Sequence, residues 1–186
     1  ISNACPGPGA CGGMYTANTM SSAIEAMGMA LPYNSSNPAI SKDKLNEKET
    51  ISKSIINLIK KDIKPSDIIT KKSIENAVRL ITLLGGSTNA VLHILAICKT
   101  ANIDFNINDF QKISEETPFL ANLKPSGKYL MEDLHNIGGI PSVMKFMLKN
   151  NMLHNDCMTV TGKTIEENLK PIESINFDQD IIRPLD

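Results

Sequence analysis

The stretch CPGPGACGGMYTANTM, residues 5–20, packs two cysteines and four glycines into its first nine positions and then becomes helix-forming. Glycines let backbone N–H groups approach a neighbouring sulfur, and the N-terminus of a helix favours negative charge. Both effects stabilise a thiolate, which is the form of cysteine that binds a metal or attacks carbon. Cys11, followed directly by Gly12 and Gly13, is therefore a candidate metal ligand or nucleophile.

Two simpler interpretations of Cys11 stay open at the level of sequence. A cysteine in a glycine-rich loop is more often a small packing residue than a ligand. A disulfide with Cys5 is the other alternative, although four cysteines in total favour a reducing compartment and redox pairs are more typically C-x-x-C. A complete metal site would also need more thiols or histidines than this stretch offers. Cys98 and Cys157 are expected to be structural.

Length and charge narrow the classes of function. At 186 residues the chain is long enough for one domain with a real core. Its 19 basic and 20 acidic side chains nearly balance, so neither a nucleic acid nor a membrane is indicated as a partner. The longest apolar run, residues 90–98, is too short to cross a bilayer. Because the sequence begins at Ile1 and stops on an extended-looking segment, we expect a fragment cut at both ends.

Apolar residues at helical spacing predict four helices in the first hundred residues. The first carries the stripe Met14, Ala17, Met20, Ile24, Met27 and Leu31 and should end near Pro32; the second carries Ile51, Ile55, Leu58 and Ile59. Thr70 is the expected cap of the third, which should end at Gly85–Gly86 and bury Ile74, Ala77, Val78, Ile81 and Leu84. Residues 90–100 are apolar nearly all round, which predicts a central helix with His93 in the core.

The second half of the chain is expected to hold shorter helices. One should start at Asn106 or Asn108 and break at Pro118, and another should lie between a turn at 125–127 and the glycines 138–139. A further helix should begin near Pro141. The stretch CMTVTG, residues 157–162, is the best strand candidate, with a last helical turn at 164–169. The sequence therefore predicts a mostly helical chain whose parent sheet, if any, lies mostly outside it.

Four stretches of the sequence resemble the dihydroxy-acid dehydratases, which are grouped with phosphogluconate and sugar-acid dehydratases. They are CPGPGACGGMYTANTMSSAIEAMGM (5–29), GGSTNAVLHILAI (85–97), SGKYLMEDLHNIGGIPSVM (126–144) and DCMTVTGKTIEENL (156–169). DIIRPLD at 180–186 resembles the linker of that family towards its second domain. Pro8 is a mild departure, because the family often has alanine there.

The resemblance implies an α/β fold with two domains. Residues 1–180 would form the mostly helical later part of the amino-terminal, cluster-binding domain, and residues 181–186 would begin the linker to a β-rich carboxy-terminal domain. Independently of the resemblance, we expect His154 to lie at the surface.

The resemblance also implies an activity. The family members are hydro-lyases that dehydrate 2,3-dihydroxy-3-methylbutanoate and 2,3-dihydroxy-3-methylpentanoate to 2-oxo acids, in valine and isoleucine biosynthesis. They use a 2Fe-2S cluster held by three cysteines, and Mg²⁺. Cys11 matches the third cluster cysteine, whereas Cys5 does not match a ligand. The other ligands, the Mg²⁺ site and the serine base would lie outside this chain, which carries no catalytic residue and should be inactive alone.

Two alternatives remain for the function: a sugar-acid or phosphogluconate dehydratase fragment, and a helical interaction module without chemistry. If the protein is a dihydroxy-acid dehydratase, its partner is a small dihydroxy acid, and the full-length protein is expected to be a homodimer. Its compartment is then a bacterial cytoplasm or a plastid.

Two further groups of polar residues are candidate substrate contacts or parts of a supporting network. Ser87, Thr88 and Asn89 should cap the helix that follows them, or offer hydrogen bonds to a substrate carboxylate. Glu132, Asp133 and His135 form a polar cluster in a short helix, which suits a supporting network, a subunit contact or a solvated face.

Overall fold

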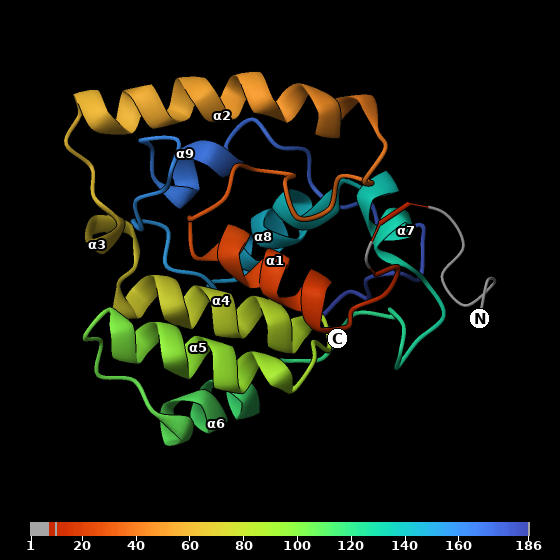
Figure 1. The fold of residues 1–186 in the computed structure, drawn as a ribbon. Helices are drawn as coiled ribbons and strands as arrows, with labels where there is room; N and C mark the ends of the chain where they lie inside the picture. The colour runs from red at the N-terminus through yellow and green to blue at the C-terminus, as the bar shows by residue number, and fades with distance from the viewer. Residues whose placement is uncertain (1–7, 10, 186) are drawn as a thin grey trace.

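The computed structural model describes residues 8–9 and 11–185, and within them the chain is helical (Figure 1). This part of the chain has no regular strands but has three isolated β-bridges: Ala121 with Ile182, Leu123 with Tyr129, and Met158 with Thr164. The helices are α1 (Thr16–Ala26), α2 (Lys42–Lys60), α3 (Pro65–Ile68), α4 (Lys71–Leu83), α5 (Asn89–Thr100), α6 (Ile107–Glu116), α7 (Met131–Asn136), α8 (Gly139–Lys149) and α9 (Ile165–Leu169).

Helix α4 joins two hydrophobic clusters. In Figure 1 it lies between α1 on one side and α5 and α6 on the other. Ile74, Val78 and Ile81 of α4 belong to the cluster shared with these helices. Leu80 and Leu83 belong to a larger cluster, which α7, α8, α9 and the carboxy-terminal segment complete. Both clusters therefore depend on α4.

The prediction for α4 is confirmed in detail. The Thr70 hydroxyl accepts a hydrogen bond from the Ser73 N–H, which satisfies one of the free donors at the helix start. All five residues expected on its buried face are buried. Gly85, at φ +67°, takes the left-handed conformation that ends the helix.

The apolar stripe expected for the first helix was only partly right. Met14, Met27 and Leu31 are buried as expected, but they flank α1 rather than lie on it. Ala17 is exposed and Met20 and Ile24 are only half-buried, and the helix ends at Ala26 rather than near Pro32. The buried face carries small or polar residues instead: Thr19, Ser22, Ala23, Glu25 and Ala26. Close approach explains this choice, because a Cβ on Gly86 would lie only 2.8 Å from the Thr19 methyl group. Larger side chains on this face would push the two segments apart.

Helix α5 is also not central, although its sequence is apolar nearly all round. Only Ala90, Ile94 and Cys98 are buried, where α5 packs against α1 and α6. Leu92 is 72% exposed, and His93 is exposed rather than in the core. The side of α5 that carries Leu92 and His93 is thus exposed among the described residues.

Helix α2 forms where expected but buries none of its 19 residues. The apolar side chains that predicted it are at the surface, with Ile55 51% and Ile59 74% exposed. The stretch 157–162 was the best strand candidate, but it forms no strand: Met158 makes one isolated bridge with Thr164, and residues 160–162 form a turn. The chain is therefore mostly helical with few strand pairings, and a sheet of an α/β domain is not seen among the described residues.

Candidate functional site

The loop that carries Cys11 is held by hydrogen bonds from three separate parts of the chain. The Asn18 amide, from the first turns of α1, donates to the carbonyls of Cys11 (3.0 Å) and Gly13 (2.7 Å). The Met131 N–H, at the start of α7, donates to the Gly12 carbonyl at 2.8 Å. The Met14 N–H donates to the Lys124 carbonyl at 2.6 Å. Both sides of Cys11 are thus fixed by the fold rather than by the loop alone.

Gly13 shows why the loop needs glycine. This residue is buried, and a Cβ there would lie 2.8 Å from the Lys124 carbonyl oxygen and 3.0 Å from the Lys124 Cβ. Gly12 is exposed and less constrained, because a Cβ there would meet only the Leu130 side chain, at 3.4 Å. The backbone at Gly13 can therefore approach residue 124 only without a side chain.

The Cys11 thiol is half-buried and donates a hydrogen bond to the Gly13 carbonyl, with Sγ 3.2 Å from the oxygen. Backbone N–H groups aimed at this sulfur were expected, but among the described residues none donates to it. A neutral thiol has a proton to donate, so the carbonyl is its natural partner. The alternative disulfide would involve Cys5, which lies outside the described residues.

Cys11 opens onto a pocket of about 400 Å³. This volume lies within the range of small-molecule sites. The pocket lies between the Cys11 loop, the start of α1, the start of α7 and residues 34–39, which adjoin α7 in Figure 1. Its lining mixes apolar residues with two charged side chains, Lys44 and Glu132, and with the following neutral polar ones: Asn18, Ser21, Asn34, Ser35, Ser36 and Asn37. The pocket therefore combines one thiol with many hydrogen-bonding groups.

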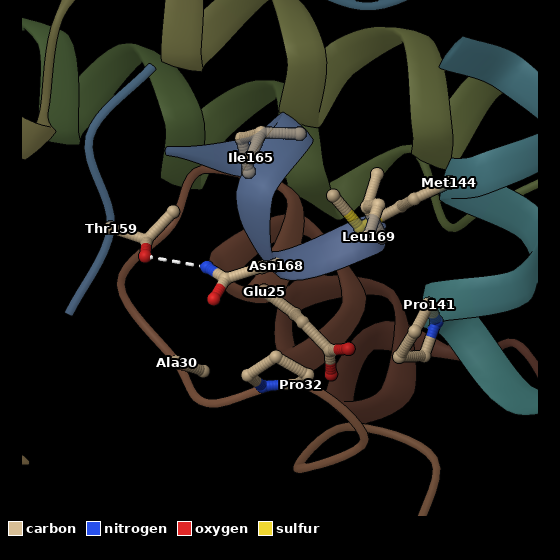
Figure 2. Close-up of a pocket in the computed structure, with 9 residues that line it drawn as sticks. All are labelled: Glu25, Ala30, Pro32, Pro141, Met144, Thr159, Ile165, Asn168 and Leu169. Carbon is tan, nitrogen blue, oxygen red and sulfur yellow. Dashed lines mark hydrogen bonds between the residues drawn. The ribbon is translucent and has the colours of Figure 1, made fainter. Parts of the chain in front are cut away.

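Glu25 is a buried carboxylate that the sequence analysis missed. It is 4% exposed and lies on the inner face of α1. Figure 2 shows its carboxylate between Pro32 and Pro141, at a small cavity that Asn168 and Thr159 also line. Burial raises the pKa of Glu25 to about 7, although hydrogen bonds from Ser35 and Tyr33 act in the opposite direction. The only sequence signal was an acidic residue between Ala23 and Ala26 on a helix.

The predicted group Ser87, Thr88 and Asn89 joins the starts of α1 and α5. The Asn89 amide donates to the Thr16 hydroxyl at 2.7 Å, and the Ser87 N–H donates to the Thr19 hydroxyl at 3.0 Å. The capping role belongs to Ser87, whose hydroxyl accepts from the Asn89 N–H at 3.3 Å. Thr88 stands at the N-cap position but caps nothing with its side chain. These three residues do not line the pocket of Cys11.

The predicted group Glu132, Asp133 and His135 does not form a network among the described residues. Glu132 is exposed and lines the pocket of Cys11. Asp133 accepts a hydrogen bond from the Leu130 N–H at 2.7 Å and so caps α7. His135 has a buried Nδ1 atom without a hydrogen-bond partner in the described part of the chain. Only Glu132 of the three shares the pocket with Cys11.

The remaining candidate residues are structural. Cys98 and Cys157 are buried, as expected, and burial raises the pKa of both thiols, that of Cys157 to about 11. His154 is not fully at the surface, because it is half-buried and lies 2.6 Å from a Glu75 carboxylate oxygen. Across residues 8–9 and 11–185 no three His, Cys, Asp or Glu side chains gather as a metal site. None of the described helices is long and apolar enough to cross a membrane.

Comparison with known proteins matches this chain to one family along most of its length. Residues 1–168 match the family model described as Dihydroxy-acid/6-phosphogluconate dehydratase N-terminal. The chain is 60% identical over 185 residues to the dihydroxy-acid dehydratase of Flavobacterium psychrophilum, with 100% of this chain and 33% of the relative covered.

Two further relatives come from distant organisms. Dihydroxy-acid dehydratase of Lactococcus lactis subsp. cremoris is 58% identical over 187 residues, which cover 100% of this chain and 33% of the relative. The relative named dihydroxy-acid dehydratase, chloroplastic, of Arabidopsis thaliana is 55% identical over 185 residues, with 100% and 30% covered. The chain thus spans about a third of the length of the curated relatives it matches, and it belongs to the dihydroxy-acid and 6-phosphogluconate dehydratase family.

Proposed function

We propose that the whole protein containing this chain is a dihydroxy-acid dehydratase. It would convert 2,3-dihydroxy-3-methylbutanoate and 2,3-dihydroxy-3-methylpentanoate to 2-oxo acids in valine and isoleucine biosynthesis. Relatives with that name, at 55–60% identity over the chain, support the proposal. The structural observation that carries it is the Cys11 loop, which three parts of the chain hold at the edge of an open pocket.

Cys11 is the residue that would hold iron, as one of three cysteine ligands of a 2Fe-2S cluster. The described residues can supply one ligand of such a cluster but not a whole site. Among them, Cys11 does not form a group with two further His, Cys, Asp or Glu side chains that could hold a metal. The other cluster ligands, Mg²⁺ with its ligands and the base would come from outside this chain. When bound, the cluster supplies an open iron position that acts as a Lewis acid on the leaving hydroxyl.

The residues of this chain would position groups rather than take part in bond breaking. Asn18 holds the carbonyls on both sides of Cys11, so the sulfur keeps its place relative to the pocket. Glu132 and the neutral polar side chains line the space that a dihydroxy acid would enter. Thr88 and Asn89 lie outside this pocket, and the contact with a substrate carboxylate that we propose for them rests only on their exposure at the start of α5.

The wider organisation is proposed on the same basis. Residues 1–180 would be part of the amino-terminal cluster-binding domain, and 181–186 would lead into a β-rich domain. The full-length protein would be a homodimer in a bacterial cytoplasm or a plastid, since the relatives include bacterial and chloroplastic proteins.

Turnover by the full-length protein tests the activity. The protein is purified without oxygen and offered 2,3-dihydroxy-3-methylbutanoate, 6-phosphogluconate or a sugar acid, and the 2-oxo acid product is detected as its hydrazone. We expect the branched-chain dihydroxy acid to be dehydrated with the highest kcat/KM. Faster dehydration of phosphogluconate or a sugar acid would place the protein in the other branch of the family, and no dehydration at all would favour an interaction module.

A further inference from the structure

Residues 33–37, here named the 33–37 loop, form one wall of the pocket that Cys11 opens onto. Asn34, Ser35, Ser36 and Asn37 all line this pocket. The backbone of the loop is strained at Tyr33, whose φ of +72° lies in the left-handed region that bulky residues avoid. Strain of this kind costs about 1–3 kcal/mol, persists only where neighbouring groups enforce it, and gathers at functional sites. The groups that enforce it here are two glutamates.

Glu25 holds the loop from the inside of the molecule. Its carboxylate oxygens accept hydrogen bonds from the Tyr33 N–H and the Ser35 N–H, both at 2.9 Å. The Ser35 hydroxyl donates a third bond, with an O···O distance of 2.5 Å. The strained residue and its second neighbour are thus both tied to one buried side chain.

Glu47 of α2 holds the same loop from the outside. One of its carboxylate oxygens accepts from the Asn34 amide at 2.6 Å, and the other accepts from the Asn37 amide at 2.7 Å. Lys44 adds to this clamp, because its ammonium group donates to the Asn34 carbonyl at 2.8 Å and lies 3.0 Å from Glu47. The loop therefore sits between two carboxylates that come from different helices.

We propose that Glu25 and Glu47 are positioning residues for substrate binding: they clamp the 33–37 loop from both sides, so that its amides and hydroxyls present a fixed polar wall to a dihydroxy acid in the pocket of Cys11. This rests on the proposed function for the identity of the substrate. Neutral donors and acceptors suit the hydroxyl groups of such an acid. Loss of the clamp would weaken binding more than it would slow the chemical step, since neither glutamate lines the pocket itself.

Two pairs of variants in the full-length protein test this proposal at pH 8. Glu25→Gln is matched with Glu75→Gln, which alters another hydrogen-bonded carboxylate, on α4 beside His154. Glu47→Ala is matched with Glu49→Ala, an exposed residue of the same helix. Because α2 buries no side chain, Glu47→Ala should fold even if Glu25→Gln does not.

Three quantities are measured on every variant: KM and kcat for the dihydroxy acid, iron content, and the rate at which iodoacetamide alkylates Cys11 in the metal-free protein. We expect KM to rise about tenfold in both clamp variants, which corresponds to about 1.4 kcal/mol of substrate binding, with kcat and iron content within about twofold. Alkylation of Cys11, followed by mass spectrometry, should become several-fold faster. Both control variants should match the wild type.

The outcomes separate this proposal from the proposed function. If the wild type dehydrates the acid but the clamp variants match their controls in KM and in alkylation rate, the two glutamates only support the fold and the proposal is wrong. If the wild type dehydrates no dihydroxy acid, the proposed function fails. Faster alkylation of Cys11 in the clamp variants would then still support the clamp, and an unchanged rate would refute it.

Discussion

Gly13 tests at the scale of one residue how the Cys11 loop is built. Replacing it with alanine places a Cβ 2.8 Å from the Lys124 carbonyl, so the loop or residue 124 must move. We expect Gly13→Ala to lower the thermal midpoint by several degrees, in keeping with about 1–3 kcal/mol for a clash in a packed region, and to reduce iron content in the full-length protein. Gly12→Ala, with 3.4 Å to the Leu130 side chain, is the control and should change both far less. Equal effects in the two variants would contradict this description of the loop.

Glu25 makes stability depend on pH. Because burial raises its pKa to about 7, from an ordinary value of 4.5, the folded state holds a proton that the unfolded state has released between these values. Its contribution to stability is therefore full below about pH 4.5 and falls as pH rises to about 7. The thermal midpoint of the wild type should therefore lie above that of Glu25→Gln by a larger margin at pH 5 than at pH 8. A difference between the two proteins that stays constant from pH 5 to pH 8 would show that Glu25 keeps its ordinary pKa.

At the scale of the elements, the caps of α4 and α2 can be compared. A cap should contribute more to the stability of the protein where its helix forms part of the core. Thr70→Ala removes the hydroxyl that accepts from Ser73, and Ser41→Ala removes the one that accepts from Lys44 at 3.1 Å. A lost cap costs about 1 kcal/mol of helix stability. We expect Thr70→Ala to lower the thermal midpoint by the amount that this cost predicts, because α4 joins both clusters. Ser41→Ala should lower the thermal midpoint only slightly, because α2 buries no side chain. A larger loss for Ser41→Ala would mean that α2 supports the fold more than its exposure indicates.

Several helix starts could be predicted from the sequence because their signals are local, whereas the end of α1 could not. Thr70 caps α4 as predicted, and Asn106, one of the two predicted starts, caps α6. The last helical turn was expected at 164–169, but the cap that Thr164 provides there was not predicted. The buried face of α1 could not be predicted in this way. Small side chains are buried there because α1 approaches its neighbours closely, which is a tertiary effect that apolar periodicity does not report.

The candidate site shows the same division. Cys11 and its glycines stand out in the sequence, and the structure places them at a pocket. Glu25 and Glu47 did not stand out, because an acidic residue on a helix usually faces solvent. Only the return of residues 33–37 between α1 and α2 gives these two carboxylates a shared partner.

At the scale of the whole molecule, the apolar outer faces of α2 and α5 have a measurable consequence. Ile59 is 74% exposed and Leu92 is 72% exposed, on two different helices. Exposed apolar patches mark interaction surfaces or cause aggregation. We expect the 186-residue chain, produced alone, to self-associate as its concentration rises, and the double variant Ile59→Lys with Leu92→Lys to do so less. Light scattering after size exclusion measures both, and a wild-type chain that stays monomeric at all concentrations would contradict the expectation.

The assignment of Cys11 as a cluster ligand is tested most directly by iron content in the full-length protein. Cys11→Ser is compared with Cys98→Ser, which changes a buried thiol of α5, and with Cys5→Ser in the same opening stretch. We predict that Cys11→Ser loses the absorption and most of the iron of the cluster together with dehydration, while both control variants keep them. Wild-type iron content and turnover in Cys11→Ser would contradict the assignment.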